Sequence, residues 1–386
     1  MRVRLSRRAR WAVPGAAVAV TAAVIAGLQI PAAQAAPDLP ARTPAQLLAS
    51  LSSDAKVPPM TGTVVESASL GLPQLPQTGN QSSLTSLLTG SHTVKVYYQD
   101  ATHFRLAVPQ PQSETDVIAD GSKLWLWQSA SDSVTEFVPP AGQVGQAEKQ
   151  LPATEALTPQ QAANQVLQAV GKTTLVSVQA NVMVAGEPAY ELVLAPKDSR
   201  SLVGRVVIAV DGKYGVPLRV QLFAKGASSP AFQVGYTNLE FVTPSPANFA
   251  FTAPSGASVD VVNLKGHGAS AAAKPATSGL GSYGKSWLTV VAFPKQDLTA
   301  GFGGISAASG SGQQPAAYSA SGQGVGVSSQ ELLSALFGSA KPVSGAWGSG
   351  SLVTTSLVSM LITGNEVYIG AVQPSVLYAA VGHTAS

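Results

Sequence analysis

Residues 91–138 constrain the fold more than any other stretch of the chain. They contain four short runs rich in Val, Tyr, Phe and Trp, at 93–98, 104–108, 115–119 and 123–128. Turn-forming residues separate the runs, and the last connection, Asp120-Gly121, is a strong hairpin signal. Strands joined by such short connections pair antiparallel with their neighbours. The stretch therefore predicts an antiparallel meander around which the rest of the domain is organised.

Alternate residues of a strand point to one face of its sheet. This rule gives apolar rows at Val94, Val96 and Tyr98, and at Phe104, Leu106 and Val108. The fourth run, Leu-Trp-Leu-Trp at 124–127, is apolar on both faces. It is either a central strand under helices or a strand with an apolar ligand on one side.

Two helices are predicted on either side of the meander sequence. Thr43-Pro44 is followed by Gln46, and Thr158-Pro159 is followed by Gln161. Each pattern combines an N-cap threonine, a proline at the first helical position and a capping-box glutamine. The helices match one another, and we expect both to cover a sheet.

Further strands are expected before and after the meander. Their runs alternate between apolar and polar residues and are bounded by turn formers, which predicts a sheet with one apolar face. The predicted strands are 60–70, 174–185, 188–195, 203–211, 217–224 and 231–241. Residues 71–90 carry leucines among Pro, Gln, Ser and Gly. They are either a lid or partner-binding loop, or an insertion whose leucines tuck into the core.

The N-terminus has the pattern of a secretory signal peptide over residues 1–35. Five arginines precede an apolar run, and Ala33-Gln34-Ala35 provides a small-residue cleavage site before Ala36. An uncleaved membrane anchor is the alternative. Cleavage removes five of the 23 basic residues and leaves 18 against 20 acidic ones. The remaining charge therefore gives no indication of nucleic-acid binding.

The residues that could carry chemistry are sparse. There is no cysteine, which excludes disulfides, thiol chemistry and a lipidated N-terminal cysteine. The histidines lack the spacing of a metal site, and no serine lies in a nucleophile elbow. Carboxylates along the meander, such as Glu114 and Asp116, are expected to be solvated on an outer face. The sequence predicts a protein that is not an enzyme and needs no cofactor.

Composition divides the chain further along. Residues 263–284 are rich in Gly, Ala and Ser and predict a flexible linker. We expect a small C-terminal α+β domain over 285–386. It begins with a strand at 287–293, has a capped helix after Ser328 and a hairpin of 356–362 with 367–372, and ends in a helical turn from Pro374.

The order of several motifs resembles the LolA-like lipoprotein-carrier family over about residues 43–260. Phe104-Arg105 is followed by Pro109, Asp120-Gly121 and the Leu-Trp-Leu-Trp run; Tyr-Glu-Leu-Val-Leu-Ala-Pro-Lys follows at 190–197 and Phe-Ala-Phe-Thr-Ala-Pro at 249–254. The resemblance implies a binding fold for acyl chains. It also implies a gating role for Arg105, as a donor to backbone carbonyls of a covering helix or loop.

The predicted fold is α+β: a strongly curved antiparallel sheet, an incomplete barrel covered by helices over residues 36–262, with the small C-terminal module beyond the linker. We expect an exported, non-catalytic carrier in the cell envelope or a secreted one, which binds acyl chains of lipids or lipoproteins. The expected lipid-binding residues are Val94, Val96, Tyr98, Phe104, Leu106, Trp125, Trp127, Leu192, Leu194, Ile208 and Val220.

Two other functions are weighed against the carrier. An RseB-like sensor would bind lipid or lipoprotein and control a membrane-bound anti-sigma factor. Such proteins share the LolA-like domain and add a smaller C-terminal domain, as this chain is expected to do. A secreted hydrolase would need a cleft with a perturbed acid or a nucleophile, and the sequence indicates neither.

Overall fold

A computed structural model describes residues 37–52, 57–69, 91–139, 158–169, 171–263, 281–295, 338 and 340–384. The predicted signal peptide, the 71–90 loop and the helix after Ser328 lie outside the described residues. So does most of the predicted linker. Within the described part of the chain, no helix is long and apolar enough to cross a membrane.

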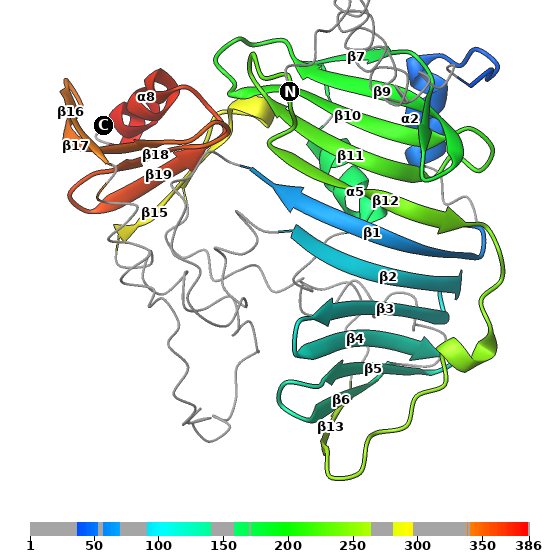
Figure 1. Ribbon diagram of the computed structural model, residues 1–386. Coiled ribbons are helices and arrows are strands. Elements are labelled where there is room, and N and C mark those ends of the chain that lie inside the picture. Colours follow the sequence, from blue (N-terminus) through cyan, green and yellow to red (C-terminus); the bar gives the residue numbers. More distant parts are fainter. Residues whose placement is uncertain are drawn as a thin grey trace, which may run out of the picture. The chain divides into compact units, whose positions relative to one another are not determined.

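The larger sheet has 13 strands and is open, with β7 at one end and β13 at the other (Figure 1). The strand order is β13-β6-β5-β4-β3-β2-β1-β12-β11-β10-β9-β7, and β8 pairs with β9 outside this path. The strands are β1 (Met60–Ala68), β2 (Ser91–Asp100), β3 (His103–Gln110), β4 (Ser113–Asp120), β5 (Lys123–Gln128), β6 (Ser133–Val138), β7 (Thr174–Val178), β8 (Val182–Val184), β9 (Glu187–Pro196), β10 (Val203–Asp211), β11 (Pro217–Ala224), β12 (Phe232–Glu240) and β13 (Ser258–Asn263).

The predicted meander is present as β2 to β5, each strand antiparallel to the next. Two-residue connections join β3 to β4 and β4 to β5, so that Gln110 pairs with Ser113 and Asp120 with Lys123. Gly121 adopts a φ of +66°, which a glycine tolerates without strain. The predicted antiparallel architecture is therefore confirmed.

Two strands at the end of the sheet were not predicted. β6 pairs antiparallel with β5, and β13 then pairs with β6 in parallel. A parallel partner arrives by a long connection without the turn residues that announce a hairpin. The predicted strand at 174–185 is also corrected, because it is divided into β7 and β8, which pair with opposite ends of β9.

Both predicted helices begin where their caps indicate. In α2 (Pro44–Ser52) the Gln46 backbone N–H donates to Thr43 Oγ1 at 3.2 Å, and the Thr43 N–H donates to Gln46 Oε1 at 2.8 Å. In α5 (Pro159–Ala169) the same reciprocal bonds join Thr158 and Gln161 at 3.3 and 2.9 Å. These are capping boxes, and they satisfy N–H groups that have no partner inside a helix.

The helices pack on one face of the larger sheet, where α5 contacts β11 and β12 and α2 contacts β7 (Figure 1). We call this side the helix-covered face and the other side the outer face. Leu47 of α2 and Ala163 of α5 are fully buried there, together with Leu192, Leu194 and Ile208 of the sheet. Removal of this apolar surface from water stabilises the association of helices and strands.

A smaller, six-stranded sheet follows, in the order β14-β15-β19-β18-β17-β16. The predicted hairpin is present as β18 and β19, and the predicted C-terminal helix is α8. Ser286–Leu288 is a 3₁₀ helix, so the strand expected from Trp287 begins only at Val290. The elements are β14 (Gly281–Tyr283), β15 (Val290–Pro294), β16 (Lys341–Gly345), β17 (Gly348–Thr354), β18 (Ser359–Ile362), β19 (Glu366–Gly370) and α8 (Pro374–Thr384).

Candidate functional site

Nine of the eleven residues predicted to bind lipid lie on the helix-covered face. Strand register explains this grouping, because directly paired residues share a face. Val96 pairs with Leu106, Tyr98 pairs with Phe104, and Leu192 pairs with Ile208. The nine residues are Val94, Val96, Tyr98, Phe104, Leu106, Leu192, Leu194, Ile208 and Val220.

The apolar face continues across both halves of the sheet. Under the helices, Leu192, Leu194 and Ile208 have 0% exposure. Tyr98 and Leu106 are half-buried and pack against this cluster. They also pack against a second cluster that contains Phe104, Leu124 and Phe137. The half-buried pair therefore joins the two clusters into one continuous apolar surface.

The structure places Trp125 and Trp127 on the outer face, away from the other nine residues. Trp125 pairs with Ile118, whereas Phe104 pairs with Ala119, which points to the opposite side. Both tryptophans pack against Phe251, with ring centroids 5.7 and 6.4 Å apart. The two indoles are thus covered by the segment 249–257 and do not line the helix-covered face.

Arg105 also points to the outer face, as the alternation predicts. Its partners differ from those that the resemblance implied, since the guanidinium donates to carboxylates of the neighbouring strand β4. One ion pair joins Arg105 Nη2 to Glu114 Oε1 at 3.3 Å, and another joins it to Asp116 Oδ2. The expected donation to backbone carbonyls of a covering element is replaced by these salt bridges.

Asp116 corrects the expectation that the meander carboxylates are solvated. Its side chain is 1% exposed. Burial raises its pKa to about 7, with a further increase from its hydrogen bond to Glu114, against the lowering effect of the Arg105 charge. Among the described residues, Asp116 Oδ1 and Arg105 Nε are buried without a hydrogen-bond partner. Both carboxylates of the cluster form ion pairs with Arg105, and the Asp116 side chain is shielded from solvent, whereas the Glu114 side chain is 41% exposed.

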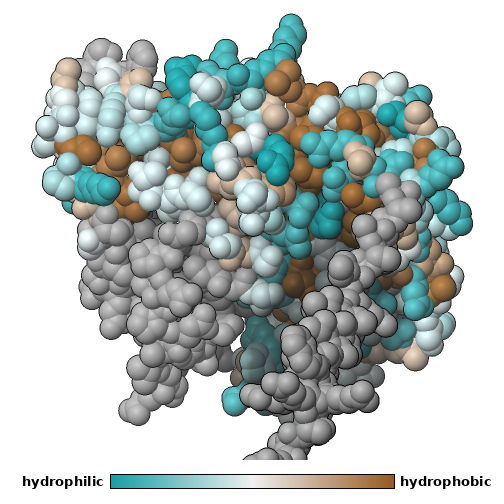
Figure 2. Space-filling view, turned by 45° about the horizontal axis from the view of Figure 1, so that its top comes forward, coloured by the Kyte–Doolittle hydropathy of each residue, from teal (hydrophilic) through white to brown (hydrophobic). Residues whose placement is uncertain are grey.

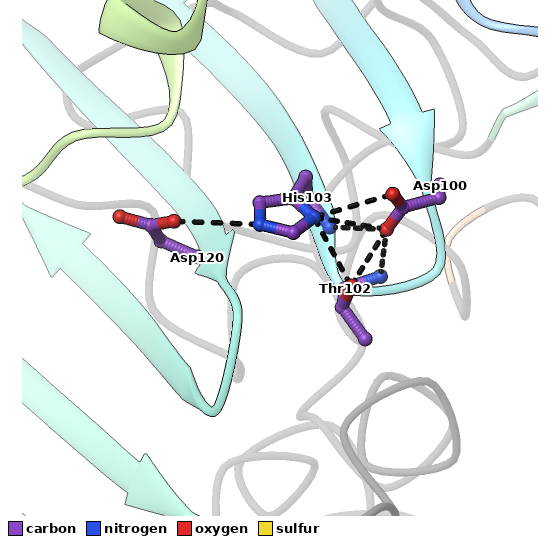
Figure 3. Close-up of polar contacts among 4 residues, drawn as sticks. All are labelled: Asp100, Thr102, His103 and Asp120. Atoms are coloured by element: carbon purple, nitrogen blue, oxygen red, sulfur yellow. Dashed lines mark hydrogen bonds and ion pairs between the residues drawn. The ribbon is translucent and has the colours of Figure 1, made fainter.

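A second polar cluster surrounds His103 at the β2–β3 connection (Figure 3). The His103 ring lies between two carboxylates, with Nδ1 3.1 Å from Asp100 Oδ1 and Nε2 3.7 Å from Asp120 Oδ1. Thr102 donates to Asp100 from its backbone N–H and its hydroxyl, at 2.8 and 2.7 Å.

Burial acts to raise the pKa of Asp100, but the bonds from Thr102 and the nearby His103 outweigh it and lower the pKa to about 2. The ring of His103 also contacts Phe249 edge-on, with centroids 6.1 Å apart. This contact places Phe249, at the start of the 249–257 segment, beside the β2–β3 connection. Within the part of the chain that the structure describes, no three His, Asp or Glu side chains are grouped to hold a metal ion.

The side chains of the helix-covered face supply an apolar surface. On the face seen in Figure 2, hydrophobic residues form separate patches between hydrophilic ones. The largest apolar cluster is instead internal, between the sheet and its two helices. An acyl chain held there would be bound by burial of its methylene groups, for which no catalytic side chain is needed.

A comparison with protein-family models and one with curated proteins give no match to this chain. Several solved structures are similar. The complex of MucA and MucB from Pseudomonas aeruginosa is 12% identical, with a TM-score of 0.37 over 88% of this chain and 95% of that chain. A LolA superfamily protein from Nitrosomonas europaea is 12% identical, with a TM-score of 0.22 over 55% of this chain and 99% of that chain.

A putative outer membrane lipoprotein-sorting protein domain from Vibrio parahaemolyticus is 11% identical, with a TM-score of 0.19 over 51% of this chain and 90% of that chain. The LolA-like resemblance noted in the sequence motifs thus has counterparts among solved structures.

Proposed function

We propose that this chain is an exported, non-catalytic protein that binds acyl chains of lipids or lipoproteins on the helix-covered face. The single observation that supports the proposal is the continuity of the apolar surface from Ile208 under the helices to Phe104 in the meander. A core that only stabilised the helices would end where they end. Here Tyr98 and Leu106 extend it and remain half-buried.

The proposal separates the two faces of the sheet. Affinity comes from burial of methylenes, each worth about 0.8 kcal/mol. The outer face, with its salt bridges and its two covered tryptophans, has a structural role. Trp125 and Trp127 are therefore left out of the proposed site, and the predicted gating role of Arg105 is not retained.

The experiment starts from the mature protein, from Ala36, purified from its own secretory route. Native mass spectrometry and organic extraction would identify any co-purified acyl species. Photolabelling with a diazirine-bearing fatty acid would then locate it. We expect labels on peptides that contain Leu106 or Ile208, and competition by unlabelled fatty acid. Labelling that is confined to the outer face, or that does not saturate, would reject the assignment.

A matched pair of variants tests the site itself. Leu106→Gln places an amide in the apolar surface at a half-buried position and should weaken fatty-acid binding. Leu175→Gln makes the same change at a leucine that is 56% exposed and should leave binding unchanged. Equal binding by both folded variants would contradict the site.

The second candidate function is an RseB-like sensor that controls a membrane-bound anti-sigma protein. It is favoured by the six-stranded sheet, which acyl binding alone does not require. Pull-down with the full mature chain as bait, with and without bound fatty acid, distinguishes the two. A membrane-anchored partner whose capture depends on fatty acid would favour the sensor.

A further inference from the structure

An apolar loop of the smaller sheet is buried in the core of the larger one. Residues 355–358 connect β17 to β18, and Leu357 in this loop is only 4% exposed. It belongs to the same cluster as Val203 and Ile208 of β10, and Val358 packs against that cluster. A leucine in a connection between strands is normally at the surface, so its position here calls for a physical reason.

The loop is shaped by its own hydrogen bonds. The Val358 N–H donates to Thr355 Oγ1 at 3.0 Å, and the Leu357 N–H donates to the same atom at 3.3 Å. In the other direction the Thr355 N–H donates to the Val358 carbonyl at 2.8 Å. These bonds do not involve the larger sheet. These hydrogen bonds therefore shape the loop that presents Leu357 from within the loop itself.

The smaller sheet contacts the larger sheet at the N-terminal ends of β7 and β10. Ser201, just before β10, forms an isolated antiparallel bridge with Val372. It is flanked by bonds from the Leu202 N–H to the Ala371 carbonyl at 2.9 Å and from the Gln373 N–H to the Arg200 carbonyl at 2.8 Å.

Side-chain hydrogen bonds add to the attachment. Trp287 Nε1 donates to Thr174 Oγ1, at the first residue of β7, at 2.8 Å. Trp287 and Ala371 also pack against the large apolar cluster. The smaller sheet thus adds apolar side chains as well as hydrogen bonds at this end of β7 and β10.

We infer that the 355–358 loop is a stopper that closes one end of the helix-covered face, and that acyl chains enter when the smaller sheet moves away from β7 and β10. The inference rests on the proposed function and adds its regulation. The deepest residues of the face have no exposure, so a ligand reaches them only if a covering part leaves. A preformed loop held by a few bonds is suited to leave and return as a unit.

The first test shortens the stopper side chain and should speed up fatty-acid uptake. Leu357→Ala removes most of the stopper side chain and should raise the rate of uptake of parinaric acid, a fluorescent fatty acid, by about tenfold. Leu352→Ala is its control, because Leu352 packs within the smaller sheet. The control should take up the fatty acid at the wild-type rate.

The cysteine-free chain also permits a reversible lock. Ser201 and Val372 are directly opposite one another, and the hydrogen bonds lie on either side of them. Antiparallel pairs of this kind have Cα atoms about 4.5 Å apart. A disulfide can span this distance. Oxidised Ser201→Cys/Val372→Cys should lose uptake and regain it on reduction. The control disulfide, Gln221→Cys/Gln233→Cys, joins β11 to β12 and should have no effect.

The outcomes distinguish the two proposals. Faster uptake by Leu357→Ala together with a redox-dependent block by the lock supports the stopper. Equal uptake by wild-type protein, Leu357→Ala and the oxidised lock overturns the stopper and leaves acyl binding intact. Absence of binding by wild-type protein, Leu357→Ala and the reduced lock overturns both. Since the reduced lock should behave as wild type, a folding defect in Leu357→Ala would not obscure the result.

Discussion

Asp116 should make the stability of this protein depend on pH in the direction opposite to most aspartates. Its carboxyl group is buried beneath the Arg105 guanidinium on the outer face and shares a hydrogen bond with Glu114. Burial, first, and the contact with Glu114, second, raise its pKa to about 7, although the Arg105 charge opposes them. The folded protein therefore keeps a proton on Asp116 that the unfolded chain releases near its ordinary pKa of 3.8.

The sign and size of the effect follow from this difference. A group with a raised folded-state pKa contributes stability that is fully present below its unfolded pKa and is lost as the pH rises to the folded value. The window thus extends from about pH 4 to about pH 7. The shift of about three units corresponds to at most about 4 kcal/mol, at roughly 1.4 kcal/mol per unit.

Urea unfolding of the chain from Ala36 onward, at a series of pH values from about 5 to about 8, measures this contribution. The unfolding free energy of wild type should fall across this range relative to Asp116→Asn, which cannot ionise. Asp198→Asn is the control: the pKa of Asp198 is lowered to about 2, so Asp198 stays ionised across this range and the variant should keep the wild-type slope. If Asp116→Asn and wild type had parallel pH profiles, burial of a protonated Asp116 would be refuted.

Three further predictions concern stability, each measured by thermal or urea unfolding. Thr43→Ala should cost about 1 kcal/mol through loss of the α2 cap, with Thr43→Ser close to wild type, and an unchanged Thr43→Ala would show that the cap is not stabilising. Leu192→Ala, at a fully buried position, should cost about 2–5 kcal/mol, whereas Leu175→Ala should lie within about 0.5 kcal/mol of wild type; equal costs would contradict the assigned burial. Gly284→Ala should cost more than about 1 kcal/mol, because Gly284 has a φ of +79° and a Cβ there would collide with the Leu288 carbonyl oxygen; a neutral effect would refute that conformation.

Local signals in the sequence were enough to predict the parts of the fold where turns are short. β10 and β11 have the predicted bounds, and both capping boxes mark the first turn of a helix. In these places the turn residues and the apolar alternation that predict an element lie within it or directly beside it in the sequence. The parallel pair of β6 and β13 could not be predicted in this way, because more than a hundred residues separate its strands.

The faces of the meander could have been predicted more sharply than they were. The Asp-Gly hairpin pairs Asp120 with Lys123, which places Leu124 opposite Ala119 and Trp125 opposite Ile118. The two-residue turn before β4 pairs Gln110 with Ser113, and continuing this register places Phe104 opposite Ala119, on the same face of the sheet. The apolar character of both tryptophans concealed this register, since the 249–257 segment gives the outer face an apolar cover of its own. The burial of Asp116 had no local signal, because it depends on that arrangement.

β1 connects the two halves of the apolar face. In the described sheet, it is the only strand between the meander, which it pairs with through β2, and the strands β7 and β9–β12, which it pairs with through β12. Its register with β12 shifts between Thr63 and Val64, and such a bulge increases the local twist and bends the strand. At Gly62 a Cβ would lie 2.8 Å from the Asn238 carbonyl oxygen, so glycine permits the close approach of β12. The curvature of the sheet is therefore concentrated in the part of β1 near Met60, which pairs with the half-buried Tyr98. These strand ends are opposite those that contact the 355–358 loop.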